Sequence, residues 1–424
     1  MRCRPVDASP RRRRLQANTR TVIAFGLALT AAIGLAPAST AATSTSCLPR
    51  PMAVTAQDAD RLFALADRKL AAAATAAPAG RKPFGALRGE AEYRRTSARQ
   101  WTSGFFAAEL WRMYQRTRDP QWLAAARDYT QDLLRIARYT GSHDLNFMVG
   151  LPTGIGAQLD PDGARRTAYA QARQTAARTL DRRWNGNVKA LKSSDYEGQW
   201  GVIVDSAMNA PLLIEIGLAQ GGPDGRRLAD HGVEHMRTLA RTFVRADGST
   251  FHRMAFDPQT GDLLGPLPGQ GLDPWRSTWA RGQAWAINGF TQAWMLTGDP
   301  VLKDAAIRTA DFWRSRVPAG CITAWDFDID NPRSPRDSGA TAIAVSGLLR
   351  LGRALGPDGA EITDYANTTL SLLTSPWLTT TYSVNPGLLL QQTVNVNSDP
   401  REGSYVWGDY YLLESLSPEI REAR

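Results

Sequence analysis

The sequence predicts an all-α fold, an (α/α)6 barrel in which six helical hairpins form a toroid. About twelve segments, mostly about 15 to 23 residues long, have apolar residues at helical spacing. Proline or glycine marks many of their boundaries, as at Asp119-Pro120, Gly298-Asp299-Pro300 and Gly356-Pro357. No alternating run is long enough to predict a sheet, so we expect the helices to pack on one another.

The predicted helices follow one another along most of the chain, each with one apolar face. In order, they cover residues 56–77, 101–117, 119–139, 144–157 (a shorter candidate), 161–183, 205–219, 223–246, 279–297, 299–316, 338–355, 359–375 and 404–418. Short strand-like pieces at Asn187–Leu191 and Ser249–Phe256 fall in longer connections, where loops over a pocket would carry them.

Six of these helices open with an aromatic or acidic cluster, whereas the helices between them open with ordinary capping residues. The clusters are Trp101–Phe106, His143–Phe147, Asp205–Asn209, Trp279–Trp285, Arg336–Gly339 and Trp407–Tyr411. This alternation is expected if every second helix points its N-terminus into one shared pocket. A pocket lined by tryptophans and a few carboxylates suits a sugar.

The N-terminal 42 residues are predicted to be a secretory signal peptide. Seven arginines precede an apolar run from Val22 to Leu35, and small residues follow at Ala36–Ala42. The run Arg11–Arg14 also permits twin-arginine export. We therefore expect a secreted protein with a flexible tail at residues 43–54, a single catalytic domain at residues 55–424 and no membrane attachment after cleavage.

Most of the net positive charge of the chain lies in this leader. The whole sequence has 50 Lys and Arg against 41 Asp and Glu, a net charge of +9. Cleavage removes seven basic residues and one acidic residue, which lowers the net charge to +3. This value argues against nucleic acid as a partner. We expect a monomer or a homodimer that binds a small oligosaccharide.

Cleavage would leave two cysteines, Cys47 and Cys321. They either pair in an oxidising compartment or remain independent thiols. The sequence has no CxxC, HExxH or P-loop motif, and its four histidines are scattered. Neither a metal nor another cofactor is therefore expected.

Asp205 and Asp144 are the predicted catalytic residues. Asp205 opens a helix after the apolar stretch Gly201–Val204, and such surroundings would raise its pKa and keep a proton available for donation. Asp144 also stands ahead of apolar residues, and repulsion between two close carboxylates would keep one protonated. Two separate helix caps are the alternative interpretation.

The segment from His252 to Trp285 is the richest in groups that could bind a sugar. Trp279, Arg281 and Trp285 surround a helix start, and Gln270 lies in the loop before it. Tryptophan faces stack on sugar rings, and arginine can hold a carboxylate in a two-pronged grip. Each tryptophan taken alone is more often part of a core.

Together these motifs resemble glycoside hydrolase family 88, the unsaturated glucuronyl hydrolases. The resemblance runs from about residue 95 to residue 418. It rests on seven ordered blocks: Trp101–Trp111, His143–Phe147, Asp205–Asn209, Ser277–Trp285, Trp325–Asp328, Arg336–Ser338 and Trp407–Tyr411.

The resemblance implies an (α/α)6 barrel that removes a 4,5-unsaturated uronic acid from the non-reducing end of oligosaccharides left by polysaccharide lyases. It makes Asp205 the acid/base that protonates C4 and activates the water that adds at C5, with Asp144 as its partner. The implied sugar-binding residues are Trp101, His252, Gln270, Trp279, Arg281 and Trp285. We add His143, beside Asp144, and Arg401, the only cation in residues 391–403, to the predicted substrate-binding residues.

Two departures from the family pattern are visible. Asn146 stands where glycine is common, and its side chain would lie beside Asp144. Residues 391–403 lack the serine- and lysine-containing pattern that some relatives use near a sulfated sugar, which removes support for a sulfated substrate.

Three other functions remain as alternatives. An unsaturated rhamnogalacturonyl hydrolase would share the barrel and the double-bond chemistry. An inverting glucan hydrolase would use its second carboxylate as a general base. An inactive secreted carbohydrate-binding barrel could lose the acid, and the presence of both Asp144 and Asp205 speaks against it.

Overall fold

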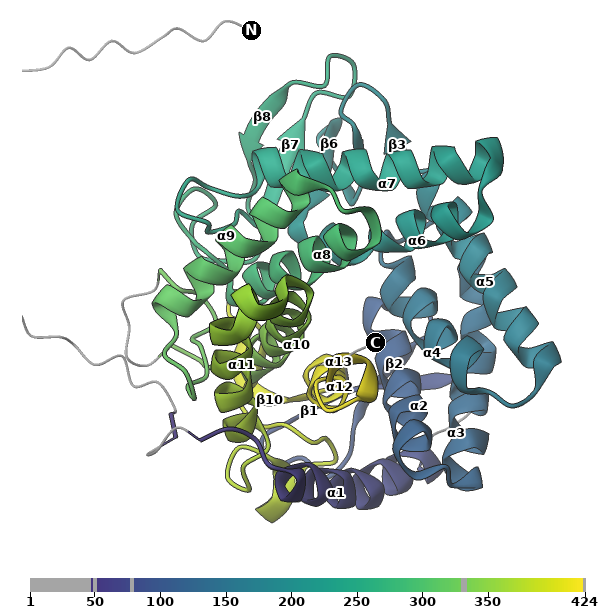
Figure 1. Cartoon of the computed structure of the whole chain (residues 1–424), viewed down its shortest axis with the longest axis vertical. Coiled ribbons are helices and arrows are strands. Elements are labelled where there is room, and N and C mark those ends of the chain that lie inside the picture. Colours follow the sequence, from purple (N-terminus) through teal and green to yellow (C-terminus); the bar gives the residue numbers. More distant parts are fainter. Residues whose placement is uncertain (1–46, 49–51, 77–79, 329–333, 422–424) are drawn as a thin grey trace, which may run out of the picture. The chain divides into compact units, whose positions relative to one another are not determined.

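The computed structural model describes residues 47–48, 52–76, 80–328 and 334–421, which belong to one compact unit. They form the predicted (α/α)6 barrel (Figure 1). The inner ring consists of α2 (Phe105–Thr117), α4 (Leu151–Leu159), α6 (Pro211–Gln220), α8 (Ala280–Thr297), α10 (Ser338–Leu355) and α12 (Val406–Glu414). The outer ring consists of α1 (Ala56–Thr75), α3 (Pro120–Gln131), α5 (Gly163–Asp181), α7 (Gly222–Thr242), α9 (Pro300–Arg316) and α11 (Ala360–Leu373).

The inner ring is closed by contacts between neighbouring hairpins. Helix α2 packs on both α4 and α12, while α8 packs on α6 and α10, and α10 packs on α12. Between α4 and α6, the backbone N–H of Asn146 donates to Oδ1 of Asn209 (3.0 Å), and the side-chain amide of Asn146 donates to the carbonyl of Met208 (2.7 Å). The signal peptide and most of the tail predicted at residues 43–54 lie outside the described residues.

Most inner helices begin without a side-chain cap, with α10 capped by Asp337 as the exception, whereas four of the six outer helices are capped and α7 and α11 are not. The outer helices α1, α3, α5 and α9 are capped by the side chains of Thr55, Asp119, Asp162 and Asp299. By contrast, α2, α4, α6, α8 and α12 begin without a side-chain cap, three of them after 3-10 or π turns: η1 (Trp101–Gly104), η3 (Asn146–Gly150) and η4 (Val204–Met208). Uncapped N-termini leave N–H groups available to a polar ligand.

Two four-stranded antiparallel sheets were not predicted from the sequence, and the expectation that no sheet would form is wrong. One has the order β2-β1-β10-β9, and the other β5-β6-β7-β8. Their strands are β1 (Arg81–Leu87), β2 (Arg94–Ser97), β9 (Gln392–Asn395), β10 (Asp399–Tyr405), β5 (Ser194–Tyr196), β6 (Gln199–Ile203), β7 (Arg253–Phe256) and β8 (Leu263–Pro266). The pair β3 (Trp184–Asn185) and β4 (Ala190–Leu191) is separate.

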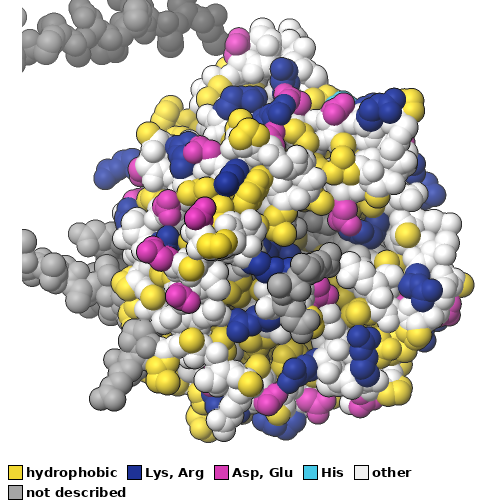
Figure 2. Space-filling model, in the orientation of Figure 1, with side chains coloured by type: hydrophobic (Ala, Val, Ile, Leu, Met, Phe, Trp, Pro, Cys, Tyr) yellow, Lys and Arg dark blue, Asp and Glu magenta, His cyan; other side chains and the backbone are white. Residues whose placement is uncertain are grey.

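These sheets lie at the end of the barrel where the inner helices begin. Strand β6 continues into η4, and β10 continues directly into α12. Figure 1 looks at the opposite end, with α12 and α13 (Pro418–Arg421) in front and β1 and β10 behind them. On this face, basic and acidic side chains of the described residues are interspersed (Figure 2). None of the described helices is both long and apolar enough to span a membrane.

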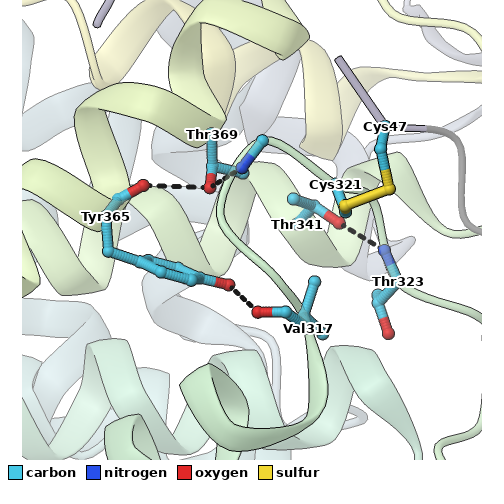
Figure 3. Close-up of a disulfide and its surroundings, with 8 residues drawn as sticks. Cys47, Val317, Cys321, Thr323, Thr341, Tyr365 and Thr369 are labelled. Carbon is cyan, nitrogen blue, oxygen red and sulfur yellow. Dashed lines mark hydrogen bonds between the residues drawn. A yellow bond between two sulfur atoms is a disulfide. The ribbon is translucent and has the colours of Figure 1, made fainter. Parts of the chain in front are cut away.

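Cys47 and Cys321 form a disulfide, so pairing is the observed one of the two alternatives (Figure 3). The bond joins the segment before α1 to the loop after α9. Beside it, the N–H of Leu48 donates to the carbonyl of Gly320 (2.8 Å). Nearer to α1, the N–H of Val54 donates to the carbonyl of Asn367 (3.2 Å). The described residues before α1 are therefore attached to the barrel.

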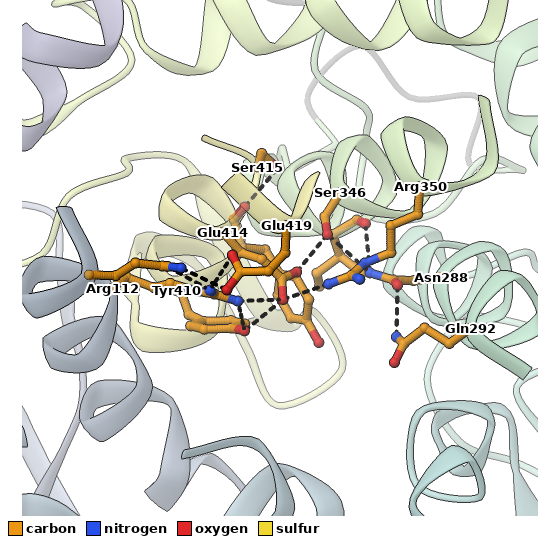
Figure 4. Close-up of polar contacts among 12 residues, drawn as sticks. Arg112, Asn288, Gln292, Ser346, Arg350, Tyr410, Glu414, Ser415 and Glu419 are labelled. Atoms are coloured by element: carbon orange, nitrogen blue, oxygen red, sulfur yellow. Dashed lines mark hydrogen bonds and ion pairs between the residues drawn. The ribbon is translucent and has the colours of Figure 1, made fainter. Parts of the chain in front are cut away.

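A buried ion network fills the end of the barrel away from the sheets (Figure 4). Glu414 accepts hydrogen bonds from Arg112 (3.3 Å), Arg350 (2.8 Å), Tyr410 (2.7 Å) and Ser346 (2.6 Å). Burial alone would raise the pKa of Glu414, but the charges of Arg350 and Arg112 outweigh it and the pKa is lowered. The network thus joins α2, α10 and α12 at this end.

The substitution Glu414→Gln is expected to lower the free energy of unfolding by about 3 kcal/mol, because it leaves Arg350 without its carboxylate and the buried Arg112 with Glu419 as its remaining partner. Thermal and denaturant unfolding at pH 7 would measure the loss. Glu361→Gln on α11 is the matched control, since this side chain is 90% exposed and makes only a long ion pair. Equal stabilities of the two variants would contradict a stabilising role for the network.

The disulfide is expected to stabilise the fold by about 2–4 kcal/mol, because it closes a long loop in the unfolded chain. Cys321→Ser should lower the melting temperature, and a reductant should lower that of the wild type to a similar value. The same reductant should leave Cys321→Ser unchanged. A wild-type protein that titrates with two free thiols after non-reducing purification would show that the bond does not form.

Candidate active site

Asp205 lies where β6 passes into η4, at the mouth of the inner ring. Its side chain is 17% exposed, and its Oδ2 is buried without a hydrogen-bond partner among the described residues. Burial raises the pKa of Asp205 to about 7, the charge of Asp144 adds to the rise, and Arg281 and Arg253 oppose it. The unpartnered oxygen argues against the interpretation of Asp205 as a simple cap, and the raised pKa gives it a proton to donate near neutral pH.

Asp144 precedes the π turn η3 and is held by three polar neighbours. Its Oδ1 accepts from the Nδ2 of Asn209 (3.2 Å), its Oδ2 accepts from the hydroxyl of Ser142 (3.0 Å), and the Nε2 of His143 lies 3.5 Å from Oδ1. The Nδ2 of Asn209 also lies 3.3 Å from the backbone carbonyl of Asp205. One amide therefore connects the two segments that carry the predicted catalytic carboxylates.

Asn146, the departure from the expected glycine, belongs to the same connection. Its side-chain amide donates to the carbonyl of Met208, and its backbone N–H donates to Asn209. The Asn146 side chain thus helps to connect η3 with η4. Asn209 was part of a recognised motif but was not predicted as a site residue, and its two-sided hydrogen bonding is visible only in three dimensions.

His252 faces the acid as a neutral hydrogen-bond donor. Its Nδ1 accepts from the backbone N–H of Gln270 (2.9 Å), so the ring proton is on Nε2, which lies 3.7 Å from Oδ2 of Asp205. Burial lowers the pKa of His252 to about 3, and the charges of Arg253 and Arg281 add to this. The Oε1 of Gln270 is buried without a partner among the described residues, so it can accept a hydrogen bond from a ligand.

Aromatic side chains form the adjacent wall. Trp101 is partly buried, with its ring centroid 5.2 Å from that of Trp407 and 5.9 Å from that of Phe147. Trp279 is 4% exposed and makes an edge-to-face contact with His252 at 5.1 Å. Of these predicted sugar-binding tryptophans, Trp101 offers the larger exposed surface.

Trp285 lies in the core beside the predicted site, and its indole Nε1 has no hydrogen-bond partner among the described residues, so its role in substrate binding stays a prediction. Its side chain is fully buried, with ring centroids 5.0 Å from Phe147 and 5.6 Å from Tyr411. Trp285 is one and a half turns into α8, which places it behind the residues at the helix start. It supports the aromatic wall from within the core.

Both Nη atoms of Arg281 already have partners within the protein, whereas its Nε is buried without one, so the grip of Arg281 on a ligand carboxylate stays a prediction. Nη1 donates to Oδ2 of Asp337 (2.7 Å) and to the carbonyl of Thr393 (2.7 Å), while Nη2 donates to the carbonyl of Val394 (2.6 Å). Arg281 is 2% exposed and lies between the rings of Trp279 (4.5 Å) and Trp407 (5.2 Å). It fixes the wall of the pocket.

Of the two remaining predicted substrate-binding residues, Arg401 is exposed and His143 is buried. Arg401 is 61% exposed on β10 and makes two hydrogen bonds of 2.8 Å to Asp399, so the structure does not bring its guanidinium together with the carboxylates of Asp144 and Asp205. Its prediction as a substrate-binding residue has no support in this geometry. His143 is buried behind Asp144, and burial lowers its pKa.

No group of three or more His, Cys, Asp or Glu side chains in the described residues is placed to hold a metal ion. The titratable groups at the site are Asp205 with its raised pKa, the neutral His252 and the hydrogen-bonded Asp144. A proton donor of this kind beside an aromatic wall suits acid/base chemistry on a sugar ring.

Comparison with known proteins agrees with this geometry. No family model matches the chain. The unsaturated glucuronyl hydrolase of Bacillus sp. strain GL1 is 32% identical over 330 residues, which cover 74% of this chain and 85% of the relative. The chain belongs to the unsaturated glucuronyl hydrolase family.

Solved structures place this family member on the same fold. A crystal structure of an unsaturated glucuronyl hydrolase specific for heparin has a TM-score of 0.79 and 29% identity, covering 87% of this chain and 99% of that one. A complex of a UGL variant with dGlcA-Glc-Rha-Glc has a TM-score of 0.76 and 28% identity, covering 87% and 97%. The predicted family is thus confirmed, and this unsaturated glucuronyl hydrolase family member is a glycoside hydrolase.

The raised pKa of Asp205 predicts a pH-dependent effect of Asp205→Asn on stability. Because the folded pKa lies above the unfolded value, the native state binds more protons than the unfolded state, and the wild type loses stability as pH rises from about 4 through 7. Asparagine does not ionise. The free energy of unfolding of the variant, measured relative to that of the wild type, should therefore increase by about 2–4 kcal/mol from pH 4 to pH 8.

Denaturant unfolding at both pH values measures this gain. Asp364→Asn, at an exposed position on α11, is the control and should track the wild type. A constant stability difference between Asp205→Asn and the wild type from pH 4 to pH 8 would show that the Asp205 pKa is not raised.

Proposed function

We propose that this hydrolase removes a 4,5-unsaturated uronic acid from the non-reducing end of lyase-generated oligosaccharides by hydrating the C4=C5 double bond. The observation that carries the proposal is the buried, unpartnered Oδ2 of Asp205, with the Nε2 of His252 facing it at 3.7 Å. Such an acid can protonate an alkene carbon without help from a metal. The names of the relatives support the same substrate class.

In the first step, Asp205 transfers its proton to C4 of the enol ether. Positive charge develops at C5 and is shared with the ring oxygen. The Asp205 carboxylate left behind then accepts a proton from a water molecule as the water oxygen bonds to C5. Asp205 is protonated again at the end, so one residue serves as acid and then as base.

The second step needs no further group from the protein. The product of hydration is a hemiketal at C5, and cleavage of its C5–O5 bond leaves a ketone at C5 and a hydroxyl on C1. C1 now carries both that hydroxyl and the glycosidic oxygen. This hemiacetal collapses to an aldehyde and releases the partner sugar as an alcohol, with one water consumed overall.

The other residues at the site hold these groups in place. Asn209 keeps Asp144 beside the segment of Asp205, and the negative charge of Asp144 favours the protonated form of the acid. The partly exposed face of Trp101 suits stacking on the sugar ring. Gln270 offers its free Oε1 to a hydroxyl group or to the attacking water.

We also propose that the protein is exported. The predicted leader lies outside the described residues, so the support comes from Cys47 and Cys321. Their disulfide fits an oxidising compartment, because such bonds rarely persist in a reducing cytoplasm. Export would bring the enzyme to oligosaccharides produced outside the cell.

The proposed reaction is tested by incubating the protein with a panel of lyase-made disaccharides and following the loss of absorbance of the conjugated double bond. Asp205→Asn should lower kcat by about 1,000-fold or more, because it removes the transferable proton and keeps the side-chain shape. Asp144→Asn should move the alkaline limb of the pH–kcat profile to lower pH, since it removes a charge that raises the pKa of Asp205.

The control is Asp364→Asn, which should keep wild-type kcat and KM. A variant Asp205→Asn that retains a tenth or more of the wild-type rate would exclude this residue as the acid. Activity restricted to rhamnogalacturonides, or release of saturated sugars from glucans, would replace the proposed substrate class by one of the two rival enzymes. Binding without turnover would favour an inactive carbohydrate-binding barrel.

A further inference from the structure

A substrate of the proposed class has a carboxylate on C5, next to the reacting double bond. Moving that charge from water into a pocket is costly unless a cation meets it. Two arginines are close enough to influence the pKa of Asp205, namely Arg281 and Arg253. Arg281 already donates to Asp337 and to two backbone carbonyls, so its charge is compensated within the protein.

Arg253 is differently placed. It opens β7 directly after His252 and lies opposite Ile203 of β6, two residues before Asp205. Its Nε is buried without a partner, and within the described residues no hydrogen bond or ion pair involves its guanidinium. The side chain is only partly exposed, so water compensates this charge incompletely.

Other arginines of this region are engaged. The Nη atoms of Arg183 donate to the carbonyls of Lys192 (2.9 Å) and Thr140 (2.5 Å). Those of Arg245 donate to several groups, including the carbonyls of Trp275 (3.1 Å) and Ser277 (3.0 Å). Arg253 differs from these arginines, because no nitrogen of its guanidinium has a partner among the described residues and the group is free to bind an anionic ligand.

The position of Arg253 also agrees with the electrostatics of the pocket. Burial lowers the pKa of His143 and His252, and the positive charge of Arg253 adds to this effect. Burial raises the pKa of Asp205, and the charge of Arg253 opposes this rise. The charge of Arg253 is therefore felt by three side chains of the site, and its backbone pairs with Ile203 on the strand that leads to Asp205. Asp337 balances Arg281, whereas no carboxylate of the described residues pairs with Arg253.

We infer that Arg253, and not Arg281, receives the carboxylate of the unsaturated uronic acid. This assignment rests on the proposed function and adds a specificity-determining residue to it. Because Arg253 adjoins His252 and faces the strand that leads to Asp205, a carboxylate held there places C5 and its neighbour C4 beside the acid. A carboxylate bound by Arg253 explains how the site selects an acidic sugar, although both Nη atoms of Arg281 already have partners within the protein.

The test compares an unsaturated uronic acid disaccharide with its C6 methyl ester as substrates of the wild type, Arg253→Met and Arg253→Lys. The ester has a different intrinsic reactivity, but that difference is the same in every variant and cancels when the acid-to-ester ratios of kcat/KM are compared. In Arg253→Met this ratio should fall by about 30- to 100-fold relative to the wild type, mainly through KM for the acid. Arg253→Lys should keep an intermediate ratio.

Two further variants and a pH profile separate the inference from a structural role. Arg226→Met, at an exposed position on α7, should keep the wild-type ratio. Arg281→Lys should lower kcat/KM for the acid and the ester alike, because it disturbs the wall that both substrates contact. In Arg253→Met the alkaline limb of the pH–kcat profile should move to higher pH, since a cation that favours ionised Asp205 is gone.

An unchanged acid-to-ester ratio in Arg253→Met, or an equal loss on both substrates, would overturn the assignment. If the acid-to-ester ratio of kcat/KM falls in Arg281→Lys instead, Arg281 is the residue that binds the carboxylate. Melting temperatures of all variants identify any loss caused by misfolding. If the wild type cleaves none of the unsaturated disaccharides, the proposed function fails, and this outcome is distinct from failure of the Arg253 assignment.

Discussion

The hydrogen bonds of the Asn209 side chain are the interaction on which both the ring and its active site depend. Its amide nitrogen reaches Asp144 and the backbone of Asp205, and its amide oxygen accepts from Asn146. The inner helices α4 and α6 are thereby joined at the point where the two carboxylates are needed. A displaced Asn209 would separate the acid from its partner and would open the ring at the same place.

The pocket holds its polar groups mostly in neutral form or as compensated pairs. Asp205 keeps a proton, His252 is an uncharged donor, and Arg281 is balanced by Asp337. Low polarity makes each remaining charge effective over a longer distance. Asp144 and Arg253 therefore have a strong influence on the acid, one favouring its protonated form and the other its ionised form.

The helices and the apolar surroundings of Asp205 were predictable because their signals are local. Apolar spacing and caps such as Asp119 and Asp299 mark the helices, and Asp205 follows an apolar run. The sheets were not predictable, since β1 and β10 are short and pair across almost the whole chain. The burial of Trp285 and the pairing of Arg281 with Asp337 could not be predicted, because spacing at a helix start does not distinguish a surface wall from the layer behind it. The disulfide was one of two open alternatives, as sequence separation carries no information on proximity.

The ion network around Glu414 bears on where a substrate can enter the barrel and where a product can leave it. Arg112, Tyr410 and Ser346 are buried with it, so the described residues are closely packed at that end of the inner ring. In the proposed reaction, substrate and product would therefore both use the end of the barrel that carries Asp205. The released sugar would then compete with the next chain end for one entrance.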